Sequence, residues 1–437
     1  MARGDLPPHE IADPALSDAG QARIDWAAAQ MPVLGSIGAR FSEQRPLDGL
    51  RVAACLHVTA ETANLMGTLR AGGAQVALCA SNPLSTQDDT ASALVRRHGV
   101  SVRAVHGEGP RAYAEHLREL ARWGPDVAID DGADLIAALH EDRQRRSTGK
   151  GQGARRPLGA TEETTIGLVR ARAMHAEGTL AFPVLAVNES HSERTFNDRF
   201  GTGQSTVDGI LRATNVLLAG RTVVVIGYGF TGRGVALRAR GAGAHVIVCE
   251  VDPVHALEAR MEGFEVMPAL DAAERGEVFI TVTGARDVLR REHFERMKDG
   301  AILANAGHFD VEINLDDLRS AAISPAREVR PLVAQYELPD RRLNLLAEGR
   351  VVNLTAAEGH PAAVMDISFA LQALCAEDLV RRGGELEVGV LAVPTGIDHE
   401  VARLKLESLE VRIDELSEAQ REYLRSWEGG STGEPIR

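Results

Sequence analysis

Hydrophobic positions in the first half of the chain follow two alternating spacings. Short apolar runs predict strands at residues 50–57, 75–80 and 100–106. Amphipathic stretches between them predict helices at residues 61–71 and 88–98. Strands that alternate with helices form βαβ units, and these units build parallel sheets. The first half is therefore predicted to be an α/β domain.

The same alternation begins again near Arg221. The segments RTVVVIG, AHVIVCE, VFITVTG and AILANAG predict strands with helices between them. Asp252 followed by Pro253 predicts the start of one helix, because Asp caps free N–H groups and Pro lacks the N–H that a first turn leaves unpaired. The fold class predicted is α/β, with two doubly wound parallel-sheet domains and a C-terminal helical tail.

The length of 437 residues suffices for two or three domains of roughly 100–200 residues each. Residues 401–420 have apolar positions at helical spacing, and residues 428–437 are polar and expected to be loose.

Composition narrows the class of protein. Asp and Glu number 62 against 48 Lys and Arg, a net charge of −14, which argues against nucleic-acid binding. No run approaches the ~18 apolar residues of a membrane span, and the first ten residues lack the apolar core of a signal peptide, so we expect a cytoplasmic protein without a membrane partner. The four cysteines are far apart and are expected to be buried thiols: Cys55, Cys79, Cys249 and Cys375. The basic, glycine-rich residues 143–156 are expected to form an exposed flexible loop, or alternatively a phosphate- or partner-binding patch.

The strongest local motif is the glycine turn Gly227-Tyr228-Gly229-Phe230-Thr231-Gly232, which directly follows a predicted strand and opens a helix. In this context the glycines allow a tight turn, close approach of a pyrophosphate and close helix–strand contact. Glu250 ends the next strand, where a carboxylate accepts hydrogen bonds from an adenosine ribose and repels a 2′-phosphate. The motif predicts NAD as cofactor. The alternative is a glycine turn in a domain without a ligand.

Polar groups also follow other predicted strands. The segments that end in Thr283-Gly284 and Gly307-His308 should line the crevice that faces the nicotinamide. In the first domain, His57, Thr59 and Glu61 follow a strand, as do Asp131 and the pair Glu163-Thr164 with Thr165, and such groups suit a cleft. The plain alternatives are a helix cap at Glu61 and Thr62, a turn held by Asp131, and a core histidine at His57.

From about residue 50 to residue 423 the sequence resembles the S-adenosylhomocysteine hydrolase family. The matching segments include CLHVTAETANLMGTLRAGGAQVALCASNPLSTQDD, IDDGADL, EETTIGL, GQSTVDGILRATNVLLAGRTVVVIGYGFTGRG, MEGFEV, NAGHFDVEI and LAEGRVVNL with GHP. The resemblance implies a tightly held NAD that oxidises a ribose 3′-hydroxyl, so that the 5′ substituent leaves by elimination, water adds and the hydride returns. It also implies an adenosine-type substrate and a homo-oligomer. Together with the pattern of strands and helices, the resemblance implies a substrate-binding domain at 1–194 that returns at 359–405, an inserted NAD-binding domain at 195–358, and a tail at 406–437.

The resemblance assigns roles to individual residues. Catalytic roles fall on His57, Asp131, Glu163, Glu193, Asn197 and His308. Substrate binding falls on Thr59, Glu61, Asn353 and His360. Cofactor binding falls on Thr164, Thr165, Asp198, Gly227, Gly229, Phe230, Thr231, Gly232, Glu250, Thr283, Gly307 and Asn353. No metal site is expected.

The chain departs from the family where the sugar is oxidised. The family pattern N-D-S-x-x-K-x-x-F-D-N reads NESHSERTFND here, so that Glu193, Asn197 and Asp198 stand where the family has Lys, Asp and Asn. Glu193 is a candidate base, with Arg194 or His191 supplying the missing positive charge. The tail after Tyr423 also lacks the lysine that the family places in a neighbouring subunit's NAD site, which leaves the order of the oligomer open.

Three functions remain at this point. The first is a nucleoside dehydratase that stops after elimination and leaves an exocyclic alkene, as in angustmycin-type antibiotics. The second is hydrolysis of S-adenosylhomocysteine with a rewired base. The third is a non-catalytic paralogue that binds NAD or a nucleoside.

Overall fold

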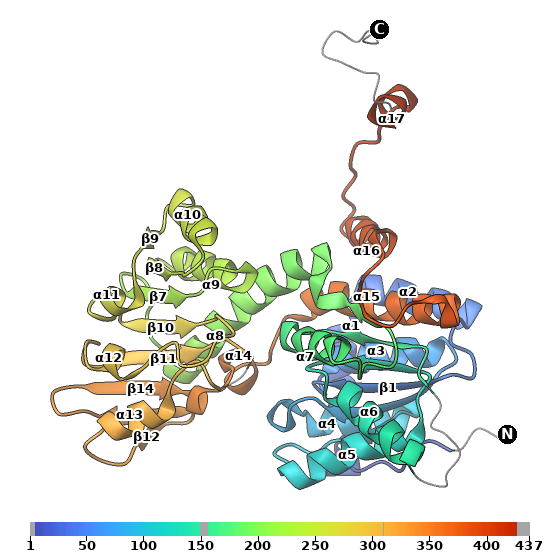
Figure 1. The fold of residues 1–437 in the computed structure, drawn as a ribbon, viewed down its shortest axis with the longest axis horizontal. Coiled ribbons are helices and arrows are strands. Elements are labelled where there is room, and N and C mark those ends of the chain that lie inside the picture. Colours follow the sequence, from blue (N-terminus) through green and yellow to red (C-terminus); the bar gives the residue numbers. More distant parts are fainter. Residues whose placement is uncertain (1–4, 149–155, 309, 426–437) are drawn as a thin grey trace.

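The computed structural model describes residues 5–148, 156–308 and 310–425. Within these ranges the main strands form two sheets, each in its own lobe with helices around it (Figure 1). The predicted α/β fold class is confirmed.

The first sheet is parallel throughout, with the strand order β15-β6-β5-β4-β1-β2-β3. Its strands are β1 (Arg51–Leu56), β2 (Gln75–Ala80), β3 (Ser101–Arg103), β4 (Val127–Asp130), β5 (Gly159–Glu162), β6 (Val184–Ala186) and β15 (Val390–Ala392). The predicted strand at 100–106 is shorter than expected. Because β15 comes from the end of the chain, the C-terminal part returns to the first lobe.

Both faces of this sheet are covered, as the side chains of β1 illustrate. Val52, Ala54 and Leu56 pack into one core, whereas Ala53 and Cys55 pack into another. The first core includes α1 (Ser17–Ala28), α2 (Pro32–Gln44), α3 (Ala60–Ala71), α4 (Asp88–His98), α15 (Ala362–Arg382) and α16 (Thr395–Ser408); the second includes α5 (Pro110–Trp123), α6 (Asp134–Thr148) and α7 (Thr165–Ala176). All four cysteines are buried free thiols, as predicted.

The second sheet has the order β12-β13-β14-β11-β10-β7-β8-β9. Its strands are β7 (Thr222–Ile226), β8 (His245–Cys249), β9 (Glu265–Val266), β10 (Val278–Thr281), β11 (Ala301–Asn305), β12 (Arg327–Arg330), β13 (Val333–Glu337) and β14 (Arg342–Leu346). The strands from β14 to β9 are parallel, whereas β12 and β13 pair in antiparallel fashion at the edge. Short connections permit antiparallel pairs, so this edge needs no crossover helix.

Helices cover this second sheet as well. Their bounds are α8 (Gly203–Thr214), α9 (Phe230–Gly241), α10 (Pro253–Met261), α11 (Ala269–Ala273), α12 (Arg291–Phe294), α13 (Leu315–Ala321) and α14 (Val352–Thr355). The start of α10 is as predicted, because the Asp252 carboxylate accepts hydrogen bonds from the backbone N–H groups of Val254 and His255.

The segment η4 (Glu193–Thr202) connects the two lobes: it contacts α9 of the second lobe and α15 of the first. It leads directly into α8, which Figure 1 shows at the junction of the lobes. This connection brings residues from both sheets to one place.

The helical spacing at 401–420 corresponds to two helices separated by an extended segment, and the predicted C-terminal helical tail is confirmed. Helix α16 ends at Ser408, Glu410 has a left-handed backbone with φ of 56°, and the separate helix α17 (Glu418–Arg425) follows at the tip of an extended arm (Figure 1). Val411 and Ile413 in this arm are exposed, so no tertiary packing stabilises a helix there.

The predicted loop at 143–156 is wrong at its start, because α6 continues to Thr148. An ion pair of 3.3 Å between Glu141 and Arg145, one helical turn apart, supports that extension. Residues 149–155 of the predicted loop and the expected loose residues 428–437 lie outside the described residues. No helix in the described part of the chain is long and apolar enough to cross a bilayer.

Candidate active site

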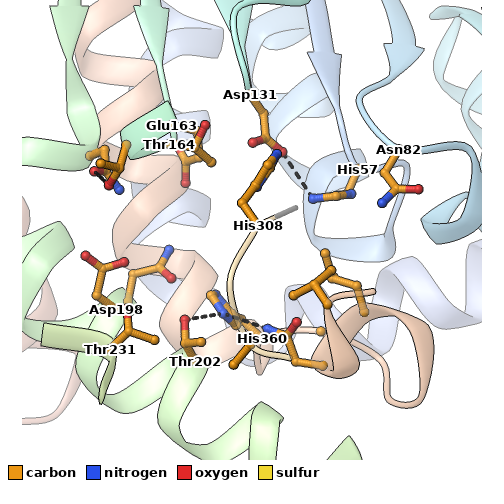
Figure 2. A pocket seen from close by; sticks show the side chains of 18 of the residues that line it. His57, Asn82, Asp131, Glu163, Thr164, Asp198, Thr202, Thr231, His308 and His360 are labelled. Carbon is orange, nitrogen blue, oxygen red and sulfur yellow. Dashed lines mark hydrogen bonds and ion pairs between the residues drawn. The ribbon is translucent and has the colours of Figure 1, made fainter. Parts of the chain in front are cut away.

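A cavity of about 360 Å³ is lined by residues from both lobes (Figure 2). It brings together most of the residues predicted for the site: His57, Thr59, Glu61, Asp131, Glu163, Thr164, Thr165, Glu193, Asn197, Asp198, Thr231, Thr283, Gly307, His308, Asn353 and His360. The predicted residues Gly227, Gly229, Phe230, Gly232 and Glu250 are not part of this lining; they form the turn beside Thr231 and the end of β8.

The glycine turn has the shape that a dinucleotide requires. Gly227 has φ of 103°, and a Cβ at Gly232 would lie 2.0 Å from the carbonyl oxygen of Gly227, so both positions need glycine. A Cβ at Gly229 would meet nothing within 4 Å, which leaves that face of the turn open to a ligand. Gly229 is the residue directly before α9, and no side chain caps this end of the helix. The free N–H groups of the first turn of α9 are therefore available to an anion.

Glu250 follows β8 next to this turn. Its carboxylate accepts hydrogen bonds of 2.6 Å from the backbone N–H groups of Tyr228 and Val251. The carboxylate is therefore held at the edge of the turn, where a ribose diol would reach it. Together with the open face at Gly229, this arrangement fits NAD.

Two further loops reach the cavity from the second sheet, at Thr283 and at Gly307. The buried carboxylate of Glu312 accepts hydrogen bonds from the backbone N–H of Thr283 (2.9 Å), its hydroxyl (2.8 Å) and the N–H of Gly284 (2.8 Å). A Cβ at Gly307 would lie 1.8 Å from the carboxylate of Glu312, so glycine is required there. Glu312 thus fixes both loops against each other.

His57 and Asp131 form an ion pair on the opposite side of the cavity (Figure 2). His57 Nε2 lies 3.1 Å from Asp131 Oδ2, and His57 Nδ1 lies 2.6 Å from Ser85 Oγ. Burial lowers the pKa of His57, the charge of Asp131 opposes that shift, and His308 reinforces it. His57 is therefore a histidine in a polar network at the cavity wall, rather than a core histidine.

The turn that carries Asp131 is held by a different carboxylate. Glu162 at the end of β5 accepts hydrogen bonds from the backbone N–H groups of Gly132 (2.8 Å) and Ala133 (3.0 Å), and from the Thr164 hydroxyl (2.9 Å). Burial raises the pKa of Glu162 to about 7. The carboxylate of Asp131 accepts from the Ser81 hydroxyl (3.0 Å), contacts His57 and lines the cavity, so the alternative that Asp131 merely holds a turn does not fit.

The cap alternative for the first turn of α3 is partly right. Thr59 is the cap, and its side chain accepts a hydrogen bond from the Thr62 N–H (3.5 Å). Glu61 lies in the first turn and lines the cavity, and burial raises its pKa. Thr165 opens α7 and donates a hydrogen bond to Asn188 (2.8 Å).

The residues that differ from the family pattern lie on η4, which is a π-helix. Because a π-helix closes its hydrogen bonds between residues five apart, side chains spaced by four or five positions face the same way. Glu193, Asn197, Asp198 and Thr202 have these spacings, and all four line the cavity. The start of η4 is fixed by Asp398 of α16, whose carboxylate accepts from backbone N–H groups of the preceding residues at 2.9 and 3.1 Å.

Three carboxyl groups gather on this side: Glu163, Glu193 and Asp198. Burial raises the pKa of Glu163 to about 8 and that of Asp198 to about 7. Burial also raises the pKa of Glu193 well above its ordinary range, and the charges of Glu163 and Asp198 add to that shift. Glu163 accepts short hydrogen bonds from Ser368 and Gln372 of α15. The carboxyl groups of this wall therefore retain protons at neutral pH.

Neither expected cation lines this wall, but the charge of Arg194 acts on Asp198 and opposes the rise in its pKa. Arg194 reaches Glu189 at 3.5 Å and lies over the ring of Phe230, and neither Arg194 nor His191 lines the cavity. Arg194 directly follows Glu193 on η4, so its side chain points away from the cavity that Glu193 lines. Among the described residues that line the cavity there is no lysine or arginine.

The remaining wall contains His360, Thr202 and Asn353. His360 Nε2 lies 2.9 Å from Thr202 Oγ1, and burial lowers the pKa of His360 to about 4, with His57 adding to the shift (Figure 2). Asn353 donates to Ser205 (3.1 Å). His360 is thus neutral at physiological pH.

Three oxygens in the cavity wall are buried without a hydrogen-bond partner among the described residues: Asp131 Oδ1, Glu193 Oε2 and Asn353 Oδ1. Buried acceptors of this kind are costly unless something donates to them. The site therefore suits a ligand that carries several hydroxyl or amino donors.

Sequence reasoning missed several residues that shape the site: Asn82, Ser85, Thr202, Glu312, Ser368 and Gln372. Ser368 and Gln372 lie on α15, whose sequence reads as an apolar helix with a few polar interruptions. Those interruptions were the available signal, because a buried polar side chain in an apolar helix requires a partner.

Comparison with known proteins gave matches along nearly the whole chain. Family models for S-adenosyl-L-homocysteine hydrolase and for its NAD-binding domain match residues 8–155 and 198–359. An adenosylhomocysteinase of Aquifex aeolicus is 56% identical over 97% of this chain and 99% of its own length. An S-inosyl-L-homocysteine hydrolase of Methanopyrus kandleri is 53% identical over 97% and 98%, and an adenosylhomocysteinase of Thermosynechococcus vestitus is 51% identical over 97% of both chains.

Proposed function

This chain belongs to the S-adenosyl-L-homocysteine hydrolase family of NAD-dependent enzymes, and we propose that it eliminates the 5′ substituent of an adenosine-type nucleoside and releases an alkene. The reaction is that of a dehydratase or lyase, of the kind needed for angustmycin-type nucleosides. It uses the oxidation and elimination steps that the family resemblance implies and omits the addition of water.

The observation that carries this proposal is the charge of the cavity wall. Carboxyl groups line the sugar side, and no described lining residue is a lysine or arginine. An anionic 5′ substituent, such as one with a free carboxylate, would enter without a cationic side chain to pair with it. A hydroxyl substituent is neutral and needs a proton in order to leave, and the His57–Asp131 pair on the other side of the cavity can supply it.

The chain's own residues have separate tasks in this proposal. Glu193 takes the proton of the sugar 3′-hydroxyl once the Glu163–Glu193 pair has lost a proton, with its unpartnered Oε2 as the acceptor, while Ser368 and Gln372 hold Glu163 in place by donating hydrogen bonds to it. When bound, NAD supplies the hydride acceptor for the 3′ carbon and returns the hydride at the end. His57 and Asp131 lie across the cavity and deliver a proton to the 5′ leaving group.

The other predicted residues support binding in this proposal. His308 assists proton transfer and Asn197 orients the sugar, while Thr59, Glu61, Asn353 and His360 hold the nucleoside. The cofactor is held by Thr164, Thr165, Asp198, Phe230, Thr231, Glu250, Thr283 and the glycines of the turn and of position 307. The open face at Gly229 and the anchored carboxylate of Glu250 support this cofactor site.

Hydrolysis of S-adenosylhomocysteine is the second candidate. It is favoured by the identity of 56% with an adenosylhomocysteinase over nearly the full chain. A relative that is 53% identical is named an S-inosyl-L-homocysteine hydrolase, so identity at this level does not determine which nucleoside is the substrate.

We also propose that residues 195–358 move as one cofactor-binding unit against residues 1–194 and 359–405, with the cavity between them. Closure would exclude water from reactive ketone and enone species. A homo-oligomer is proposed as well, with the exposed arm at residues 409–425 as the natural contact, since it has no buried residues in the described chain.

Product analysis tests the proposal. The purified holoenzyme is incubated with S-adenosylhomocysteine and, separately, with nucleosides that have a free 5′-hydroxyl. The products are identified by mass spectrometry. An alkene lighter than its substrate by one water supports the dehydratase. Release of homocysteine without any alkene would overturn it in favour of hydrolysis.

A further inference from the structure

The hydrogen bonds around Ser85 determine which nitrogen of His57 carries a proton. Ser85 ends the short helix η2 (Pro83–Ser85), and its hydroxyl donates to the carbonyl oxygen of Asn82 (2.9 Å). The same hydroxyl oxygen lies 2.6 Å from His57 Nδ1. A serine hydroxyl has a single hydrogen, and when that hydrogen is directed at the Asn82 carbonyl the oxygen faces His57 as an acceptor. His57 Nδ1 must then carry the proton of that hydrogen bond.

The turn around Ser85 leaves its hydroxyl little choice. Asn82 caps η2 through its side chain, which accepts from the Leu84 N–H (3.0 Å), and the Asn82 carbonyl oxygen also accepts from the Ser85 N–H (3.1 Å). The carbonyl thus lies directly over the serine, as in a local side-chain-to-backbone bond.

The other ring nitrogen faces a carboxylate. His57 Nε2 lies 3.1 Å from Asp131 Oδ2, which also accepts from the Ser81 hydroxyl (3.0 Å). With Nδ1 protonated, a neutral imidazole presents a lone pair at Nε2. Two acceptors at this distance repel each other unless a proton lies between them. The His57–Asp131 pair therefore contains one proton in addition to that on Nδ1.

We propose that Ser85 is a positioning residue that, by fixing the tautomer of His57, keeps a transferable proton between His57 and Asp131 for the 5′ leaving group. The inference rests on the proposed function. The ionisable groups that face His57 are Asp131, His308 and His360. Because burial and His308 disfavour the charged ring, the shared proton is readily given up.

The C4′–H bond breaks and its proton goes to a base of the site, while a C4′–C5′ double bond forms. The bond between C5′ and the leaving oxygen breaks, and that oxygen takes the shared proton and departs as water. His57 then has a proton on Nδ1 and Asp131 is a carboxylate. The base releases the proton that it took from C4′ and the His57–Asp131 pair takes one up before the next cycle, so no net proton is gained or lost.

The test compares the holoenzyme with Ser85→Ala and Ser85→Thr. Oxidation alone is followed with 5′-deoxyadenosine, which has no 5′ leaving group, through the absorbance of reduced nicotinamide. Elimination is followed with a nucleoside whose 5′-hydroxyl is the leaving group. We expect Ser85→Ala to slow elimination by about tenfold or more while oxidation stays within about twofold, and Ser85→Thr to restore elimination. Ser408→Ala is the matched control, because Ser408 makes the same kind of hydroxyl bond to a backbone carbonyl far from the cavity (2.8 Å).

A second measurement reads the tautomer directly. Nitrogen-15 NMR is recorded on histidine-labelled holoenzyme, and His57 is assigned by the loss of its signals in His57→Asn. We expect a protonated Nδ1 in the wild type and a changed ratio of the Nδ1-protonated to the Nε2-protonated tautomer in Ser85→Ala. Equal slowing of both steps, or a wild-type His57 with a bare Nδ1, would overturn the inference. If the wild type eliminates from no nucleoside, the proposed function fails, while the NMR result still decides the tautomer.

Discussion

Glu163 and Glu193 face each other in the wall of the cavity, and the negative charge of Glu163 is second only to burial in raising the pKa of Glu193. The two side chains come from different elements, since Glu163 follows β5 and Glu193 begins η4. Two buried carboxyl groups so placed hold protons between them at neutral pH. Glu193 stands where the family resemblance implies an ammonium group.

Replacing Glu193 by Gln should abolish most turnover. The amide has the same size but cannot take a proton, so we expect the maximal rate to fall by about 10²–10⁴-fold. The melting temperature should stay the same or rise, because a buried acid beside Glu163 is removed. Initial rates and thermal unfolding check this, with the exposed Glu292→Gln as control. Undiminished turnover in Glu193→Gln would rule out Glu193 as the base.

Restoring the family pattern should change the reaction. The triple change Glu193→Lys, Asn197→Asp and Asp198→Asn places an ammonium group beside Glu163 and reverses the local charge. We expect homocysteine release from S-adenosylhomocysteine to increase and alkene formation to decrease. A triple variant whose product ratio equals that of the wild type would show that these positions do not select the reaction.

Stability without ligands should fall as the pH rises from about 6.5 to about 8.5. Glu162, Asp198 and Glu163 have pKa values of about 7, 7 and 8 in the folded chain, against ordinary values of 4.5, 3.8 and 4.5. In this window the folded chain retains protons that the unfolded chain has lost, so stability decreases by up to about 1.4 kcal/mol per pH unit for each such group.

Histidine has an ordinary pKa of 6.5, so below about pH 7.5 the unfolded chain still binds protons at His57 and His360, whose pKa values are lowered in the folded chain, and this uptake partly offsets the fall; above about pH 7.5 the carboxyl groups determine the slope. Urea unfolding of the NAD-free protein at the two ends of the window measures the change. Glu163→Gln should reduce the slope. Stability that is flat or rises across this range in the wild type would contradict the pKa shifts.

Gly229→Ala should fold normally and lose the cofactor. A Cβ at this position meets no protein atom within 4 Å, so it would occupy the face left open to a ligand. NAD content, measured after denaturation of the purified protein, should drop by at least tenfold, with an unchanged melting temperature before NAD is added. Gly241→Ala, at the exposed end of α9, is the control because its Cβ also meets nothing. Normal NAD content in Gly229→Ala would place the pyrophosphate elsewhere.

Much of the fold could be predicted from local patterns. The strands β2, β7 and β8 begin and end where the hydrophobic runs do, because each run is buried on both faces of a parallel sheet. The arm after α16 could not be predicted in this way. Its apolar residues have helical spacing, but no packing surface within the described chain stabilises a helix there.

The parts of the site whose backbone is fixed by a sequence motif could be predicted. The parts whose conformation depends on tertiary packing could be predicted less well. The glycine turn and the loop at His57 follow strands, so their position was set by the sheets. The π-helical winding of η4 was not predictable, since it depends on tertiary contacts such as those with Asp398 and α15. That winding turns Glu193 inward and leaves Arg194 outside, which a sequence motif does not reveal.

We infer that a sugar carbon is transiently oxidised by the bound nicotinamide before the 5′ group leaves. The most direct measurement uses a nucleoside with deuterium at the 3′ carbon and follows both the rate and the bound cofactor during turnover. We predict a slower reaction, transient reduced nicotinamide and deuterium recovered in it. A rate unaffected by deuterium, with no reduced cofactor at any time, would contradict the account.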